Sequence, residues 1–540
     1  MTNNKWLRRA LLGGVALSVM TTGAQADDLD SLKQQIEALQ SRVNQLESQP
    51  AVVAAPAETG ISFRRGDSLA SWNTDRAQEG TSPADRGFTI AITPTADVPA
   101  PVTEVTVSGY VKADFIWDFD QANLGSTFTS GTGIDQRYQK DIGFSTHAKQ
   151  TRFRIRSKTD TAIGQIRTLI EGHFFGAGGT FALRHAWGEW DMTPNWTLGI
   201  GRYWRLGYDV YTGVSLVDFG GSAGAPGKSR TEQIRLTYAS GPITFNFGLQ
   251  GPQYGGGDTQ VQNNCNAGTL CSNTSFGNVT SYNREYWNPT ESRSRALTNT
   301  SNLPSFGAHM TYDAPGGNQL FLGAEVQQNN IDVDATGWYW DGPVDNNAHF
   351  GNKNKFGWVV SAGANVNLAD IATLTGSISY SEGLVSRITG AGGDIWGLHT
   401  RTRVDGEPDV YTHSVRQAKA FGGYIGASFD MTDTVSFNTQ FGFVDPKDSS
   451  MVGGGITYSH MYTGHANIMW QPVRQMRLGW EIMYAQKTNG KAYVNGISDF
   501  RGDVQNAGGD CGIAGGGYND SCRKRKEDAW RAQFGAWFFF

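Results

Sequence analysis

The sequence predicts an all-β transmembrane fold, a barrel of sixteen antiparallel strands, preceded by a short N-terminal coiled-coil helix. Apolar residues recur at every second position in many short segments, the period of a strand with one apolar face. The chain of 540 residues holds 69 Gly and 28 Phe, 16 Trp and 19 Tyr, which favour turns and strands. Its mean hydropathy of -0.40 excludes a bundle of membrane helices.

The N-terminal residues 1–26 have the pattern of a secretory signal peptide. Lys5, Arg8 and Arg9 precede a short apolar run at residues 11–19, and Ala24-Gln25-Ala26 offers a small-x-small cleavage site. The formal charge of -5 becomes -8 when these three basic residues are lost (-5 - 3). Nothing in this charge balance favours a nucleic-acid partner.

Residues 27–49 show a heptad pattern that predicts a coiled coil. About three heptads are too short to be stable alone, so partner chains must bury the apolar stripe. A lone amphipathic helix on another surface is the alternative. The two core positions are occupied by Leu29, Ile36 and Val43 and by Leu32, Leu39 and Leu46.

Residues 50–103 read as a linker of unknown fold. Pro50 ends the helix, and the segment that follows is rich in Ala, Thr, Pro and Asp. Its aromatic residues Phe63, Trp72 and Phe88 could dock on the barrel or in its mouth, and the pattern does not discriminate between these placements.

Residues 104–540 are predicted to form the barrel. Short and long connections alternate, and an even number of strands leaves both chain ends of the barrel on the periplasmic side. The candidate strands are 105–117, 149–158, 162–174, 181–191, 196–204, 231–239, 243–250, 304–312, 319–327, 355–368, 371–380, 418–430, 433–443, 455–470, 474–487 and 527–540.

The last strand ends on Phe540 after a two-residue stripe of aromatic and small residues. A closing aromatic residue of this kind resembles the assembly signal of bacterial outer-membrane barrels. We therefore expect the protein in the outer membrane of a Gram-negative bacterium, with its N-terminal arm in the periplasm. Trp117, Trp190, Trp196, Trp470 and Trp480 lie near strand ends, as interfacial aromatic residues do.

Arg152, Arg154 and Arg156 occupy alternate positions of one predicted strand, so their side chains share one face. An Arg at the lipid midplane costs about 2–4 kcal/mol, so this arginine ladder must face the lumen. Two interpretations remain: structural pairing with Glu171, Glu232, Glu325 and Glu481, or a partly unpaired ladder that attracts anions. The same alternation of faces along the strands places four further arginines in the predicted pore lining: Arg167, Arg184, Arg235 and Arg477.

The connection 205–230 is predicted to fold inward and narrow the channel. It contains the apolar stretch Leu216-Val217-Asp218-Phe219 and a glycine-rich continuation. In this arrangement Asp218 and Lys228 would face the constriction. The alternative is a loop exposed at the surface.

No motif predicts catalysis, a metal or a cofactor, so we expect no enzyme. Gly220, Ser222 and Gly224 match a nucleophile elbow but lack the strand and helix that this motif needs.

The four cysteines form two local pairs in an exported chain, which predicts the disulfides Cys265 with Cys271 and Cys511 with Cys522. A four-cysteine metal site would favour closer spacing. The basic run 523–526 would face water or lipopolysaccharide phosphates.

Several fragments in order resemble the family of DcaP-like trimeric outer-membrane porins. They are the heptads after the signal peptide, the strand from Val107 to Phe115, Leu183-Arg-His-Ala-Trp187, Leu198-Gly-Ile-Gly-Arg-Tyr-Trp204 and the aromatic terminus. The resemblance implies a homotrimer with a periplasmic coiled coil, and diffusion of small anionic solutes such as dicarboxylates. This chain departs from the family pattern in two ways. Its segment 61–101 before the first barrel strand is longer, and its heptads by themselves favour a dimer.

Two functions from different classes follow from these observations. The first is passive transport through an anion-selective channel with partners limited to lipid, lipopolysaccharide and solute. The second is structural, a barrel whose periplasmic arm tethers the outer membrane to the cell wall or to a partner.

Overall fold

The computed structural model describes a single barrel unit and leaves out several segments of the chain. It describes residues 60–94, 102–119, 124–128, 142–225, 229–252, 298–334, 338–339, 342–343, 349–368, 371–389, 395–402, 410–447, 458–489 and 526–540, except residues 71, 73, 84, 85 and 302. The predicted signal peptide (1–26), the predicted coiled coil (27–49) and the two cysteine pairs lie outside the described residues.

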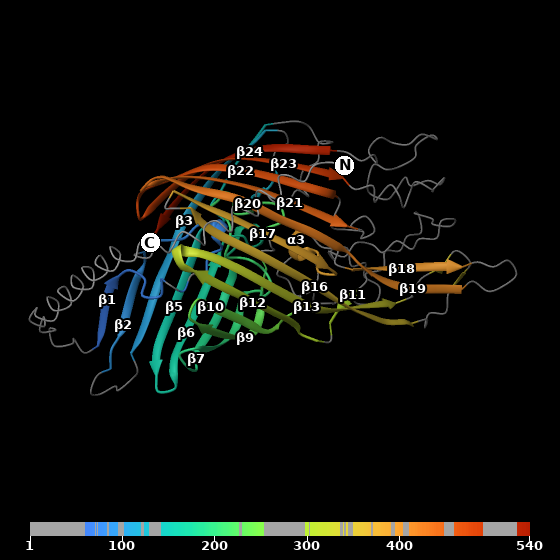
Figure 1. Cartoon of the computed structure of the whole chain (residues 1–540), viewed down its shortest axis with the longest axis horizontal. Coiled ribbons are helices and arrows are strands. Elements are labelled where there is room, and N and C mark those ends of the chain that lie inside the picture. Colours follow the sequence, from blue (N-terminus) through green and yellow to red (C-terminus); the bar gives the residue numbers. More distant parts are fainter. Residues whose placement is uncertain are drawn as a thin grey trace, which may run out of the picture. The chain divides into compact units, whose positions relative to one another are not determined.

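Sixteen antiparallel strands form the barrel, each paired with the next along the chain (Figure 1). The strands are β3 (Thr103–Asp118), β5 (Arg152–Thr161), β6 (Gly164–His173), β7 (Ala182–Asp191), β8 (Trp196–Trp204), β9 (Arg230–Ser240), β10 (Ile243–Gln250), β12 (Ser305–Ala314), β13 (Asn318–Asp334), β16 (His349–Leu368), β17 (Ala372–Glu382), β20 (Lys419–Thr432), β21 (Val435–Lys447), β22 (Tyr458–Val473), β23 (Met476–Asn489) and β24 (Lys526–Phe539).

The sheet closes because the last strand pairs with the first. β24 lies antiparallel to β3, with Phe538 opposite Val111 and Phe534 opposite Phe115. Closure leaves no free strand edge along the barrel wall, which is the condition for a sheet in a bilayer. The predicted sixteen-stranded antiparallel barrel is confirmed.

Each predicted strand overlaps one barrel strand, and the largest extensions beyond the predicted ranges are in β13 and β16. β13 continues to Asp334 and β16 starts at His349, and the two pair as far as Asp332 opposite Asn352. The alternation of apolar residues stops earlier, near residue 326. Apolar alternation is needed only where one face meets lipid, whereas strand pairing can continue in water.

Smaller elements extend or join the barrel strands. β4 (Gly143–His147) pairs with β3, β11 (Thr298–Thr300) with β13, and β14 (Trp338–Tyr339) with β15 (Gly342–Pro343). β18 (Ile395–Thr402) and β19 (Val410–Gln417) form a separate hairpin in a connection predicted as a loop. Short helices are η2 (Ala77–Glu79), η4 (Ala177–Gly179), η6 (Pro315–Gly317) and α3 (Ser386–Thr389).

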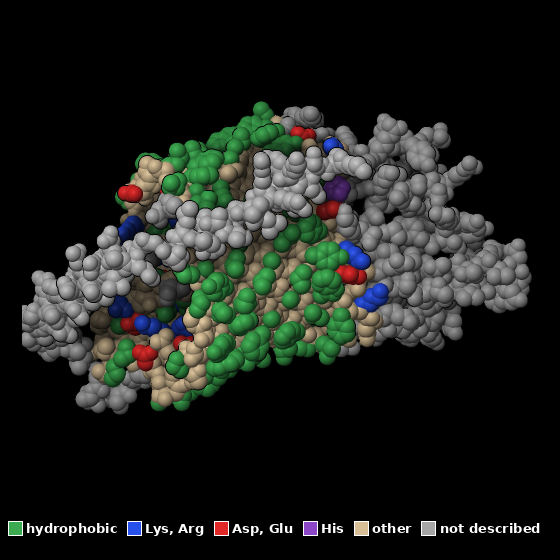
Figure 2. Space-filling view, viewed as in Figure 1, with side chains coloured by type: hydrophobic (Ala, Val, Ile, Leu, Met, Phe, Trp, Pro, Cys, Tyr) green, Lys and Arg blue, Asp and Glu red, His purple; other side chains and the backbone are tan. Residues whose placement is uncertain are grey.

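The barrel wall has an apolar outer face and a polar inner face. A broad band of hydrophobic side chains covers the outside of the strands, with charged side chains gathered at its margins (Figure 2). In β5 the aromatic Phe153 is 40% exposed, whereas Arg152 and Arg154 on either side are 1% exposed. This alternation is that of strands between lipid and a polar interior.

Among the described residues, no helix is long and apolar enough to cross a membrane.

Candidate anion site

Residues 66–87, here called the lumenal segment, leave the barrel end and return to the same place. They connect β1 (Ile61–Arg65) to β2 (Phe88–Ile92), which pair with each other, and β2 pairs with β3. At its base the amide of Gly66 donates to the carbonyl oxygen of Gly87 over 2.9 Å. Gly87 has φ +78°, and a Cβ there would meet the Val107 carbonyl oxygen at 2.5 Å, so only glycine fits.

The lumenal segment lies inside the barrel, because it contacts strands that are far apart around the wall. The indole of Trp204 on β8 donates to the Thr74 carbonyl oxygen over 2.9 Å. The guanidinium of Arg477 on β23 donates to the Thr81 carbonyl oxygen over 2.6 Å. Segments that contact both sides of a closed barrel can only fill its interior.

The arginine ladder is buried and ion-paired. Arg152 Nη1 lies 2.5 Å from Asp75 Oδ1 and 2.9 Å from Glu79 Oε2, and Arg154 Nη2 lies 2.6 Å from Asp75 Oδ1. Arg156 pairs with Asp67 and donates to the carbonyl oxygens of two further residues of the lumenal segment. The ladder is therefore paired in this structure, and mainly with carboxylates that come from the lumenal segment.

Glu171 on β6 is the wall carboxylate of the same cluster. Its Oε2 lies 2.5 Å from Arg154 Nε, and its Oε1 lies 2.8 Å from Arg184 Nε on β7. Arg184 Nη2 in turn lies 3.1 Å from Glu79 Oε1. We call Arg152, Arg154, Arg184 and Glu171 the wall cluster; its three guanidinium groups exceed its one carboxylate by two charges.

The two carboxyl groups of the lumenal segment are held ionised by this surplus. Burial alone would raise the pKa of Asp75, but the charges of Arg154 and Arg152 outweigh it, so the pKa lies below its ordinary value. Burial also opposes the ionisation of Glu79, yet Arg152 and Arg184 hold its pKa well below the usual range. Both side chains thus act as anions bound to the wall.

The other predicted pore-lining arginines lie around this cluster. Arg167 lies 3.0 Å from Glu189 and 2.8 Å from Asp191, and its guanidinium is 5.5 Å from the ring of Trp72 in the lumenal segment. Arg235 lies 3.5 Å from Glu189 and stacks on Trp187 at 4.7 Å. Six of the seven predicted arginines contact the lumenal segment; among the described residues, Arg235 contacts the wall instead.

The carboxylates named in the pairing interpretation are distributed along the wall. Only Glu171 meets the ladder. Glu232 pairs with Arg202, Glu325 with Arg205 and Arg387, and Glu481 with His465. The sequence parity argument could not identify these partners, because strand register and loop paths decide which side chains meet.

Residues 205–225, here called the inner loop, pack against the opposite wall from inside. Thr212 Oγ1 lies 2.7 Å from the hydroxyl of Tyr424 on β20, and the amide of Val214 donates to Gln440 on β21 over 3.2 Å. The amide of Ala223 donates to Thr463 on β22 over 2.8 Å. The inner loop also meets the lumenal segment, since the Leu216 amide donates to the Gln78 carbonyl oxygen over 3.0 Å.

Asp218, predicted to face the constriction, is buried among wall and loop groups. Its carboxylate accepts the amide of Phe128 over 3.0 Å and lies 4.0 Å from Arg531 Nη1 on β24. This ties the inner loop to the barrel seam. Lys228 lies outside the described residues.

Sequence reasoning missed the residues of the lumenal segment, above all Asp67, Asp75 and Glu79. The available signal was charge complementarity, because these three carboxylates precede a ladder of three arginines. A polar stretch without a regular period gives no indication that it lies inside the lumen of the barrel. Within the described residues, no group of three or more His, Cys, Asp or Glu could hold a metal ion.

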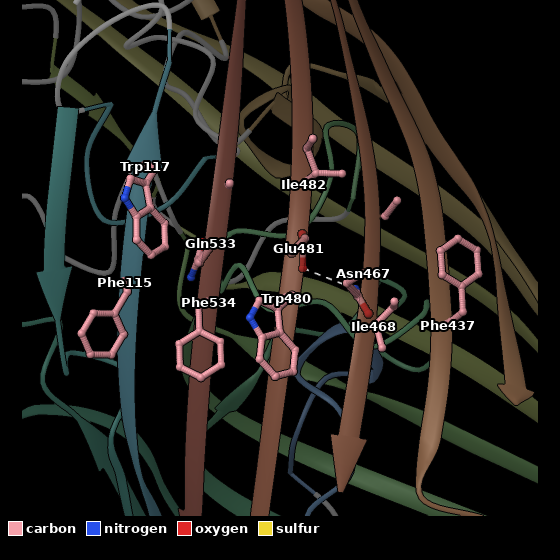
Figure 3. Close-up of a pocket in the computed structure, with 12 residues that line it drawn as sticks. Phe115, Trp117, Phe437, Asn467, Ile468, Trp480, Glu481, Ile482, Gln533 and Phe534 are labelled. Atoms are coloured by element: carbon pink, nitrogen blue, oxygen red, sulfur yellow. Dashed lines mark hydrogen bonds between the residues drawn. The ribbon is translucent and has the colours of Figure 1, made fainter. Parts of the chain in front are cut away.

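The outer wall near the seam shows the lipid-facing counterpart of the site. Aromatic side chains of β3, β23 and β24, including Phe115, Trp480 and Phe534, lie side by side over a groove (Figure 3). Trp480 is 50% exposed, whereas its chain neighbour Glu481 is 3% exposed and lies 3.3 Å from the amide of Asn467. One residue step therefore separates the apolar surface from the polar interior.

No family model matches the sequence, and no curated protein matches it either. By structure, the chain is similar to the outer membrane channel DcaP of Acinetobacter baumannii, with 15% identity over 81% of this chain and 97% of that chain and a TM-score of 0.53. It also aligns with the anion-selective porin from Comamonas acidovorans (13% identity, 81% and 100% covered, TM-score 0.43). The first similarity confirms, at the level of the fold, the resemblance to the DcaP-like porins.

Proposed function

We propose that this chain is an outer-membrane diffusion channel for small hydrophilic solutes, with a preference for anions such as dicarboxylates. The observation that carries the proposal is the wall cluster, three guanidinium groups around one carboxylate on the inner face of a closed barrel, whose remaining partners Asp75 and Glu79 belong to a separate segment of the chain. Fixed charges in a pore wall raise the local concentration of ions of opposite sign. The guanidinium fork suits carboxylates because it donates two parallel hydrogen bonds.

The apolar outer band supports the membrane location in this proposal. Exposed Phe, Trp, Ile and Leu side chains on the outer face would be unfavourable in water but match lipid. We include in the proposal that the barrels associate as a homotrimer and that residues 27–49 form a coiled coil in the periplasm. Heptads that favour a dimer would be overridden when the barrels hold the helices together at high effective concentration.

Liposome swelling tests the proposed transport directly. Liposomes containing the purified protein are placed in isosmotic succinate or in an uncharged sugar of similar size, and the swelling rates are compared with those of empty liposomes. We expect faster entry of succinate than of the sugar, and a smaller difference for the Arg152→Gln/Arg154→Gln variant. Liposomes that never swell would instead favour a structural barrel that serves as a tether.

A further inference from the structure

The lumenal segment brings two carboxylates to the place where a dianion would be attracted. The wall cluster carries two surplus positive charges, and Asp75 and Glu79 supply two negative ones. Asp75 is shared by Arg152 and Arg154, while Glu79 is shared by Arg152 and Arg184. Asp75 and Glu79 thus match the surplus of the wall cluster in number, while Arg76 of the segment itself also pairs with Glu79, at 3.1 Å.

The two carboxylates are close enough to imitate the two ends of one small molecule. Asp75 Oδ1 and Glu79 Oε2 both contact the same atom, Arg152 Nη1, at 2.5 and 2.9 Å. A short aliphatic dicarboxylate can place its two ends at such a separation. Its guanidinium partners would be the same three arginines.

The segment does not use all the donors of the cluster. Arg152 Nη2, Arg154 Nη1 and Arg184 Nη1 are buried and have no hydrogen-bond partner among the described residues. A buried donor without a partner costs free energy, about 1–3 kcal/mol each. A mobile dianion can adopt an orientation that satisfies more of them than side chains fixed to η2 and its flanks can.

We propose that the wall cluster is a dianion-binding site and that Asp75 and Glu79 occupy it as an internal competitor, which a small dicarboxylate displaces as it passes. The inference rests on the proposed channel function and deepens it by naming the regulation of the site. In this exchange, a dicarboxylate binds the wall cluster when the lumenal segment is released from it.

The attachment of the lumenal segment at both ends makes this exchange feasible at ordinary solute concentrations. The lumenal segment is anchored at both ends by the β1–β2 pairing and the Gly66 to Gly87 hydrogen bond, so the barrel does not unfold when the segment leaves the cluster. Its release also breaks the hydrogen bonds that its backbone accepts from Trp204 and Arg477. Tethered groups compete with an effective concentration on the order of millimolar for a short flexible connection. A dicarboxylate that exchanges similar ion pairs would therefore compete in that range.

The test measures how succinate blocks chloride current through single channels in a planar bilayer. The variant Asp75→Asn/Glu79→Gln removes the internal competitor but leaves the wall cluster intact. If the segment is bound for about 90% of the time, its removal should lower the half-blocking succinate concentration about tenfold. Glu232→Gln serves as the matched control, because Glu232 pairs with Arg202 and, among the described residues, does not meet the ladder.

A third variant separates failure of the inference from failure of the proposed function. In it, residues 68–86 are replaced by a short glycine-rich connection. An anion-selective current in this variant, with equal succinate block in the wild type and in Asp75→Asn/Glu79→Gln, would overturn the internal competitor while leaving the channel in place. No anion-selective current from the shortened variant, with its barrel folded by circular dichroism, would overturn both.

Discussion

The two polypeptide segments that fill the lumen are held by different chemistry. The lumenal segment contacts β5 and β7 through ion pairs between guanidinium and carboxylate groups. The inner loop contacts β20, β21 and β22 mainly through neutral hydrogen bonds, such as Thr212 to Tyr424 and Ala223 to Thr463. Its ion pairs, Arg205 with Glu325 and Asp218 with Arg531, join it to β13 and β24 instead. Ion pairs respond to pH and to competing anions, whereas neutral hydrogen bonds do not. The comparison identifies the lumenal segment as the adjustable part and the inner loop as the fixed one.

The largest effect is expected from Arg154→Ala. This substitution leaves the carboxylates of Asp75 and Glu171 buried with fewer counter-charges, and breaking a buried ion pair costs about 3–5 kcal/mol. The lumenal segment should detach, exposing Arg76 and Arg86, which are buried in the wild type. Faster trypsin cleavage after these two arginines measures the release; unchanged cleavage would contradict the role of the ladder as its anchor.

Acidification should release the same segment with a smaller effect, because it neutralises carboxylates without removing guanidinium groups. Burial raises the pKa of Asp75 and Glu79, but the neighbouring arginines lower it by more, so both pKa values lie below the ordinary ones. The two ionised carboxylates therefore contribute fully to docking of the lumenal segment above the ordinary carboxyl pKa near 4. This contribution is lost as the pH falls through the lowered values. The charged groups facing these carboxyls are Arg76, Arg86, Arg152, Arg154, Arg184, Arg477 and Glu171.

Single-channel conductance between pH 7 and pH 3 checks this pH dependence. We expect conductance to rise in acid as the segment leaves the lumen. The variant Asp75→Asn/Glu79→Gln should show a much smaller step, since Asp75 and Glu79 no longer titrate and only Glu171 of the wall cluster still can. A step of equal size in that variant would place the titration elsewhere.

Gly87→Ala should loosen the base of the lumenal segment. The positive φ of Gly87 and the close Val107 carbonyl oxygen exclude a Cβ, and forcing one costs about 1–3 kcal/mol. We expect trypsin cleavage after Arg86 to increase while the barrel melts at an unchanged temperature. The matched control is Gly66→Ala, which also has positive φ but no atom within 4 Å of its added Cβ.

Tyr424→Phe should produce the smallest effect and sharpen the contrast with the ladder. It removes a hydroxyl that lies 2.7 Å from Thr212 Oγ1 and 2.9 Å from the Thr212 carbonyl oxygen, a loss of about 1 kcal/mol. Thermal unfolding should shift by a few degrees at most. Succinate block and its pH dependence should stay as in the wild type; a change in either would show that the inner loop also regulates the anion site.

The sequence predicts the barrel better than its contents. Strand positions such as residues 196–204 and 243–250 match β8 and β10 to the residue, because alternation is imposed by lipid on one side and polar groups on the other. The inward direction of Arg152, Arg154 and Arg156 follows from the same constraint. Their partners do not, because Asp67, Asp75 and Glu79 belong to a segment without periodicity whose position is set by long-range charge pairing.

The β18–β19 hairpin is a second structure that the sequence pattern does not predict. Its strands pair from Ile395 opposite Gln417 to Thr402 opposite Val410, yet the sequence there mixes apolar, charged and small residues without a clear two-residue period. A hairpin outside the lipid band does not require a continuous apolar face. Periodicity therefore identifies the strands that meet lipid and leaves other pairings undetected.

The reversal potential across a KCl gradient in a planar bilayer tests the central claim most directly. If the guanidinium groups of the wall cluster govern permeation, the wild-type channel passes chloride in preference to potassium. Arg152→Gln/Arg154→Gln leaves Asp75, Glu79 and Glu171 with Arg184 as their guanidinium partner in the cluster, so it shifts the reversal potential towards zero or past it. A preference for potassium in the wild type, or an identical reversal potential in the variant, would contradict the claim.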